Sequence, residues 1–278
     1  MAPVITLTTD FGNQDAYVAN IKGIILNINH KATVVDITHT IEPYNIGHAA
    51  YIISTVFHYF PSGTIHIVII DPSVGSQRNA VIFKTPSAIF LAPDNGVLSY
   101  IIDELEQPLL HPTSDIMTEL QQKHVPKNTQ AISITNQNYW NHPVSTTFHG
   151  RDIFAPVAAH LSLSTPIQKF GEKIDSLNVF PISHPHLDHE GNMNGKILYI
   201  DHFGNLITNI REQYLPQGKI SITIGHHTIS GLGTCYHQSK GLTAIINSNG
   251  YLEVAFKEGS AARLLGCKMG EQVKISQG

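Results

Sequence analysis

The stretch that most constrains the fold is the apolar run Ile65–Ile70, which ends in an Asp-Pro pair. Its residues are mostly β-branched, which is typical of a strand buried on both faces of a sheet. After Asp71 the chain passes through a short glycine-containing turn and reaches Arg78. A carboxylate and a guanidinium thus follow the carboxyl end of a central strand, where open α/β sheets bind ligands. On this stretch alone, a solvated loop with a surface ion pair explains the residues equally well.

The preceding residues predict a β-α-β-α-β order, and therefore right-handed crossovers and a largely parallel central sheet. Helices are predicted where apolar residues recur at helical spacing. The predicted elements are strands at 4–8, 33–37 and 65–70 and helices around 17–28 and 46–60. After them we expect a hairpin at 80–92, a short helix to 102, one strand at 131–135 within a polar surface excursion, and a helix at 153–161.

The composition changes at Asp175–Asn194, where Pro, Asn and His dominate and periodicity disappears, as in an interdomain linker. Beyond it, short strands at close spacing predict a small antiparallel barrel or sandwich. We therefore expect an N-terminal α/β domain over 1–175, a linker over 176–194 and a smaller C-terminal β-barrel-like domain over 195–278. The expected strands there are 195–201, 206–210, 220–224, 227–230, 242–247, 251–256 and 272–275, with a short helix near 260–265.

Bulk composition argues against several classes of partner. The net charge of −4 over 278 residues does not suit nucleic acid or a membrane surface. No apolar run reaches the ~18 residues of a membrane span, and the N-terminus lacks the basic region of a signal peptide. Cys235 and Cys267 supply neither a disulfide framework nor a zinc quartet. We therefore expect a cytoplasmic protein.

Polar side chains occur at the ends of the predicted strands. Asp10 follows the first strand, Asp71 and Arg78 follow the third, and His149 lies in a loop just before a helix. Because the carboxyl ends of parallel strands share one edge, we expect a pocket there. In it Asp71 could orient His149, and Arg78 could hold an anion or polarise water. The alternative is coincidence, because Asp is a common turn residue.

The sequence HPHLDH at His184–His189 matches the H-x-H-x-D-H pattern of metallo-β-lactamase-like hydrolases, in which these side chains ligate zinc. Its context differs, because it lies in the predicted linker and fewer than a hundred residues follow it. We therefore expect no metal site. Two further segments, Asp201–Asn205 and Asn247–Gly250, are explained by β-turn chemistry or by groups that bind a polar ligand.

Seven short motifs, in order along nearly the whole chain, resemble those of one enzyme family. They are TTDFG from Thr8, DITHTIEPYNI from Asp36, DPSVGSQR from Asp71, APDNG from Ala92, FHGRD from Phe148, DHFGN from Asp201 and NSNG from Asn247. The set is similar to the S-adenosyl-L-methionine (SAM) hydroxide adenosyltransferases, or SAM hydrolases, which are homologous to the SAM-dependent fluorinase and chlorinase.

The resemblance implies an N-terminal α/β domain and a C-terminal barrel-like domain assembled as a homotrimer. SAM would lie between the N-terminal domain of one subunit and the C-terminal domain of the next. The family pattern implies a catalytic triad of Asp71, Arg78 and His149. It also implies substrate-binding roles for Asp10 at the ribose, Tyr44 beside the nucleoside, and Asp201, Asn205 and Ser248 at the methionine end or adenine edge. Asn249 stands where the halogenases carry Arg.

The implied reaction is hydrolysis of SAM to adenosine and L-methionine, with water attacking C5′ in line with the departing sulfur. SAM is the substrate, and no cofactor is implied. His149 could accept the water proton, oriented by Asp71, while Arg78 stabilises developing hydroxide. One alternative is a SAM-dependent halogenase, which Asp71 disfavours because it would repel a halide. The other is a non-catalytic SAM- or adenosine-binding protein with a structural triad.

Overall fold

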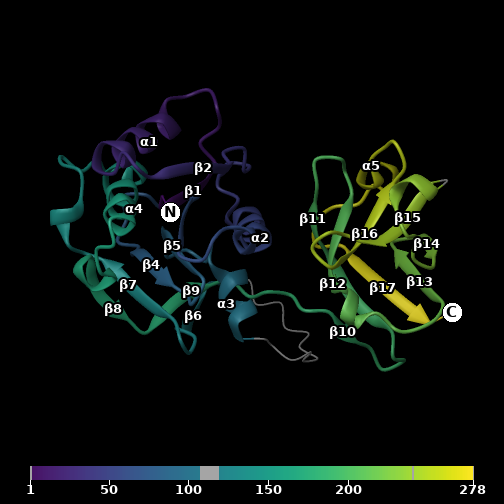
Figure 1. The fold of residues 1–278 in the computed structure, drawn as a ribbon. Helices are drawn as coiled ribbons and strands as arrows, with labels where there is room; N and C mark the ends of the chain where they lie inside the picture. Colours follow the sequence, from purple (N-terminus) through teal and green to yellow (C-terminus); the bar gives the residue numbers. More distant parts are fainter. Residues whose placement is uncertain (1, 107–118, 240, 278) are drawn as a thin grey trace. The chain divides into compact units, whose positions relative to one another are not determined.

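The computed structural model describes residues 2–106, 119–239 and 241–277 (Figure 1). The chain forms two compact units, and the division falls between Ile182 and Ser183. This point lies within the segment 176–194 that the composition marked as a linker. The segment carries strand β9 (Ser176–Val179) in the first unit and strand β10 (His186–Leu187) in the second.

The first unit is built on a mixed, largely parallel sheet, as predicted. The strand order is β2-β1-β3-β5-β4-β7-β8, with parallel pairing from β2 to β5 and antiparallel pairing beyond. The bounds are β1 (Val4–Thr9), β2 (Thr33–Thr38), β3 (Thr64–Ile69), β4 (Ala80–Lys84), β5 (Ala88–Pro93), β7 (Gln130–Ile134) and β8 (Gly171–Ile174). All six residues of β3 are buried, which confirms the prediction of a strand covered on both faces.

Helices cover both faces of this sheet (Figure 1). Helices α1 (Tyr17–Ile28) and α4 (Ala155–Ser162) share one buried apolar cluster with the sheet. Helices α2 (Ile46–Val56) and α3 (Ser99–Glu106) share the other. A π-helical turn, Gly150–Phe154, precedes α4, and its register is marked by the Ala155 N–H donating to the Gly150 carbonyl. Single 3₁₀ turns lie at Phe57–Tyr59, Gln137–Tyr139, Ile167–Lys169, Glu212–Tyr214 and Tyr236–Gln238.

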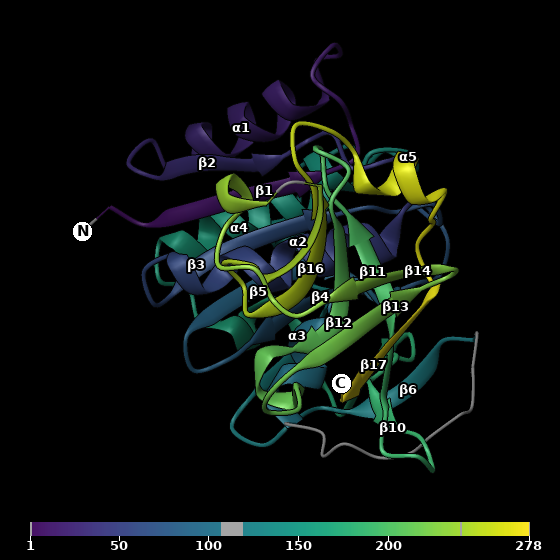
Figure 2. The same ribbon diagram turned by 90° about the vertical axis from the view of Figure 1, so that its right-hand side faces the viewer.

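The second unit is an antiparallel sheet that is nearly closed into a barrel, as predicted (Figure 2). The strand order is β14-β13-β17-β11-β12-β16-β15, and β10 pairs with β11. Alternate residues of β13 are buried, as expected for a strand with one face on a core. The bounds are β11 (Met193–Ile200), β12 (Leu206–Arg211), β13 (Ile220–Ile224), β14 (His227–Ser230), β15 (Leu242–Ile246), β16 (Tyr251–Phe256), β17 (Gln272–Gln277) and α5 (Ala261–Leu265).

The expectation of a single strand within the polar excursion was wrong. Strand β6 (Gln121–His124) also forms there and pairs with β9 in a separate two-stranded sheet. Its sequence, QQKH, has no apolar residue, so nothing in the side-chain pattern predicts it. Within the part of the chain that the structure describes, no helix is long and apolar enough to cross a membrane. Both cysteine thiols are free, and a cytoplasmic location stays a prediction.

One titratable side chain is buried in the core of the first unit. His66 on β3 is 1% exposed, and its Nδ1 lies 2.8 Å from the Thr6 hydroxyl. The imidazole stacks on the Phe90 ring at a centroid distance of 5.2 Å. Burial lowers the pKa of His66 to about 4, so the folded protein holds this ring neutral.

We expect His66 to make the protein less stable in acid. Between pH 4 and 6.5, His66 is mostly protonated in the unfolded chain and mostly neutral in the folded protein. The free energy of unfolding therefore falls as the pH falls. From pH 7 to pH 5 this one group should cost about 2 kcal/mol. Urea unfolding of the wild type and His66→Phe at both pH values measures it. Equal losses in the two proteins would contradict the assignment.

Candidate active site

A buried ion pair lies just beyond the carboxyl end of β3. Arg78 Nε donates to Asp71 Oδ1 at 3.0 Å, and Arg78 Nη2 donates to Asp71 Oδ2. The Ser73 hydroxyl donates to Asp71 Oδ1 at 3.3 Å. The two charged side chains are only 9% and 5% exposed, so this pair is not the solvated surface pair that the sequence also allowed. A buried, bidentate pair holds both groups in one orientation.

His149 is joined to this pair through the arginine. Arg78 Nη2 lies 3.0 Å from His149 Nδ1. A guanidinium can only donate, so Nδ1 must be the acceptor and the neutral ring carries its proton on Nε2. The sequence suggested that Asp71 orients His149, and the described contacts place Arg78 between them.

The surroundings of His149 favour its neutral form. Burial of the ring and then the charge of Arg78 lower the pKa of His149, while Asp71 and Asp152 oppose them with a smaller effect. At neutral pH the imidazole is therefore uncharged, with a protonated Nε2. This proton lies on the only ring nitrogen that Arg78 does not contact.

A close approach of two loops brings these residues together. Gly75, in the turn between Asp71 and Arg78, has a φ of +83°. A Cβ atom on it would lie 2.4 Å from the carbonyl oxygen of Thr146, in the loop that leads to His149. Only glycine permits both the left-handed backbone and this contact.

The site opens into a pocket of about 310 Å³ at the carboxyl edge of the sheet. Besides Asp71 and His149, it contains two further residues that the sequence predicted, Asp10 and Tyr44. A hydrogen bond links them, because the Tyr44 backbone N–H donates to Asp10 Oδ2 at 2.9 Å. Tyr44 is 70% exposed. The lining residues are Asp10, Phe11, Tyr17, Pro43, Tyr44, Ile69, Asp71, Val74, Thr147, Phe148, His149 and Gly150.

Three aromatic rings form an apolar wall of this pocket that the sequence analysis missed. Phe11, Tyr17 and Phe148 pack against one another with centroid distances of 5.7, 5.8 and 5.2 Å. Phe11 and Phe148 belong to the TTDFG and FHGRD motifs, so the motifs themselves carried the signal. The sequence analysis singled out only polar residues of these two motifs, Asp10 and His149.

The predicted binding residues Asp201, Asn205 and Ser248 lie in loops of the second unit. Asp201 Oδ1 accepts from the backbone N–H of Phe203 and of Asn205, at 2.9 and 2.8 Å, and Asn205 Nδ2 donates to Asp201 Oδ2 at 2.9 Å. Asp201 and Asn205 are thus brought together. Ser248 is exposed at the tip of the Asn247–Gly250 turn.

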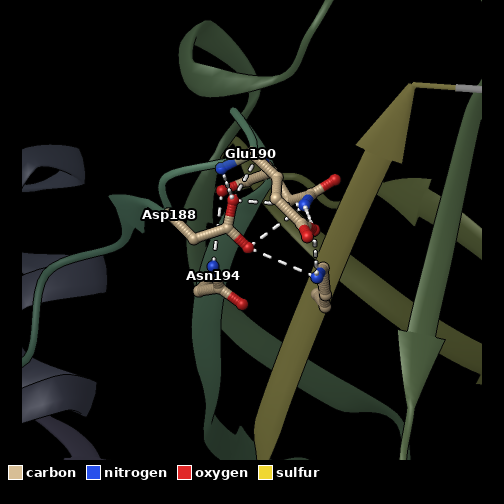
Figure 3. Close-up of polar contacts among 5 residues, drawn as sticks. Asp188, Glu190 and Asn194 are labelled. Atoms are coloured by element: carbon tan, nitrogen blue, oxygen red, sulfur yellow. Dashed lines mark hydrogen bonds and ion pairs between the residues drawn. The ribbon is translucent and has the colours of Figure 1, made fainter.

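The HPHLDH sequence is organised around one carboxylate. Asp188 accepts hydrogen bonds from the Asn192 and Glu190 backbone and from Asn192 Nδ2, and Lys274 Nζ lies 3.3 Å away (Figure 3). This carboxylate therefore closes its own loop. Within residues 2–106, 119–239 and 241–277, no group of three or more His, Cys, Asp or Glu side chains is arranged to hold a metal ion.

Comparison with known proteins agrees with these features. The SAM hydroxide adenosyltransferase N-terminal domain matches residues 5–171 and the C-terminal domain matches residues 195–274. An (R)-S-adenosyl-L-methionine hydrolase from Methanocaldococcus jannaschii is 32% identical, over 98% of this chain and 95% of its own. A fluorinase from Actinopolyspora mzabensis is 25% identical, over 99% and 97%. The crystal structure of an uncharacterized conserved protein from Thermotoga maritima has a TM-score of 0.84 and 30% identity, covering 98% and 100%.

A buried Asp-Arg pair and a neutral imidazole beside a pocket at the carboxyl edge of an α/β sheet are typical of an enzyme active site. The two family domains match most of the chain, and the alignments with the relatives cover nearly all of it. The chain belongs to the SAM hydroxide adenosyltransferase family, which is related to the fluorinases.

Proposed function

We propose that this protein hydrolyses SAM to adenosine and L-methionine. The observation that carries the proposal is the hydrogen-bonded series Asp71–Arg78–His149 beside the pocket, in a family whose relatives include named SAM hydrolases. Water supplies the oxygen that bonds to C5′, and the electrons of the C5′–S bond pass to sulfur. Methionine leaves as a neutral thioether, so the departing group needs no general acid.

The chemical demand therefore falls on the water. With Nδ1 occupied by Arg78, the His149 nitrogen left for the water is the protonated Nε2. We assign His149 as a donor that holds the water oxygen in line with C5′, and the Arg78 charge as stabilisation for developing hydroxide. Asp71 lines the same pocket and is the carboxylate we assign to accept the proton.

Substrate binding is proposed to use the residues of both units. Asp10 would hold the ribose hydroxyls and Tyr44 would lie beside the nucleoside, since both line the pocket. Asp201, Asn205 and Ser248 would contact the methionine end or the adenine edge. A carboxylate acceptor is an unsuitable neighbour for a halide, which favours water over the chloride or fluoride of a halogenase.

The activity test is incubation of purified protein with SAM in buffers containing chloride or fluoride. We expect adenosine and methionine in every buffer, at a rate that the halide does not change. Halogenated adenosine would instead identify a halogenase. SAM binding without any product, measured by calorimetry, would identify a non-catalytic binding protein.

We also propose a homotrimer in which the second unit of one subunit completes the site of another. Ligand-type residues lie in loops of both units, and the family pattern pairs them across subunits. Light scattering should give three times the 30.5 kDa chain mass. A monomer with full activity would rule out shared sites.

The role that we assign to His149 predicts different turnover for two substitutions at this position. Gln can place an amide N–H near the position of the imidazole Nε2–H, whereas Ala has no donor. We therefore expect His149→Gln to keep more turnover than His149→Ala, with similar SAM affinity in both. If His149 were the proton acceptor, His149→Gln would be as inactive as His149→Ala. Measurement of the single-turnover rate constant, beside calorimetric SAM affinity, distinguishes the two outcomes.

A further inference from the structure

Asp152 is a fully buried carboxylate three residues after His149. It accepts hydrogen bonds from Arg151 Nε and Nη2 at 2.7 and 2.8 Å, from Asn141 Nδ2 at 3.0 Å and from the Ser145 backbone N–H at 2.8 Å. Burial raises the pKa of Asp152, but these hydrogen bonds together lower it below its ordinary value. The carboxylate of Asp152 therefore stays ionised at neutral pH. It is not among the residues that line the pocket.

These bonds fasten an irregular loop to the π-helical turn. The loop runs from Asn141 to Thr147, and its first backbone N–H donates to the Asp152 carbonyl at 2.8 Å. The side chain of Asp152 then holds the loop again at Ser145. Such a loop has few internal backbone partners, so the carboxylate replaces the hydrogen bonds that a regular element would provide.

The 141–147 loop, which Asp152 holds, contacts the turn between Asp71 and Arg78 and leads directly to His149. Its residue Thr146 presents the carbonyl oxygen against which Gly75 packs, and Gly75 lies in the turn between Asp71 and Arg78. The following residues, Thr147 to Gly150, line the pocket and carry His149. A shift of the loop would therefore change the distance between Arg78 and His149.

We propose that Asp152 is a positioning residue for the Arg78–His149 contact, acting through the 141–147 loop and the π-helical turn. The inference rests on the proposed function for its effect on turnover, but its geometry does not. The charged groups facing His149 are Arg78, Asp71 and Asp152. Because Arg78 lowers the pKa of His149, a longer Arg78–His149 distance should also raise that pKa.

The test compares Asp152→Asn with a control substitution at a carboxylate for which we propose no role in the reaction. Asp188→Asn removes a charge from a similar set of backbone and side-chain hydrogen bonds in the second unit (Figure 3). We expect Asp152→Asn to lower kcat by about 10- to 100-fold, the effect of a displacement near 1 Å, with a smaller change in KM. Asp188→Asn should leave kcat unchanged.

A second readout needs no activity. NMR titration of the imidazole signals, with His149 assigned from the His149→Gln spectrum, should show a higher His149 pKa in Asn141→Ala than in the wild type. The sign follows because Asn141→Ala keeps the Asp152 charge and loosens the loop, so that Arg78, whose charge lowers the His149 pKa, lies farther from the ring. Asp188→Asn should leave this titration unchanged. A wild-type protein that forms no adenosine overturns the proposed function alone, since the NMR comparison remains valid.

Wild-type kcat in folded Asp152→Asn, or an unshifted His149 titration in folded Asn141→Ala, would overturn the positioning role. Should Asp152→Asn fail to fold by circular dichroism, Asn141→Ala takes its place, because it removes one anchor and keeps the charge. A folded Asn141→Ala should show a lower kcat with a nearly constant KM. Wild-type kinetics in that variant would overturn the proposal.

Discussion

The site depends on one buried ion pair, Asp71 with Arg78. Placing two charges where they are 5% and 9% exposed costs solvation energy, and such pairs are often no more stable than apolar side chains of the same shape. The cost is offset here because each end makes a further contact: the carboxylate also accepts from Ser73, and the guanidinium lies 5.7 Å from the Phe154 ring centroid. Stability is a weak reason for this pair. Its consequence is a guanidinium N–H fixed toward His149.

That fixed N–H decides the chemistry of the imidazole. An arginine donor at Nδ1 selects the tautomer with its proton on Nε2, and the same positive charge helps to keep the ring neutral. A histidine prepared in this way can hold a water oxygen but has no lone pair on Nε2 for the water proton. In the reaction we propose, His149 therefore orients the water and a carboxylate accepts its proton, two tasks that the residue types alone left combined.

Much of the architecture could be predicted because it follows from periodic apolar residues. The run at Ile65–Ile70 gave a strand buried on both faces, and the spacing in 17–28 gave its helix. Strands β6 and β8 could not be predicted, since QQKH and GEKI are short and lack an alternation of polar and apolar residues. Strand β9, SLNV, does alternate, but it has only four residues and lies in the segment whose composition indicated a linker. The motifs contain the four predicted site residues that line the pocket, Asp10, Tyr44, Asp71 and His149. The order of the hydrogen bonds was hidden, because Arg78 and His149 are 71 residues apart and tautomers depend on three-dimensional contacts.

The same polar device recurs in the irregular segments of both units. The carboxylates of Asp152, Asp188 and Asp201 each accept at least one backbone N–H and so stabilise a loop that has few apolar residues. These hydrogen bonds stabilise the loop to which each carboxylate belongs, so they are no evidence of a ligand by themselves. Asp71 differs in its partner: it binds a guanidinium that in turn contacts an imidazole at a pocket. The hydrogen bonds of Asp71 thus lead out of its own turn to His149, and the loop that Asp152 holds is the one that precedes His149 in the chain.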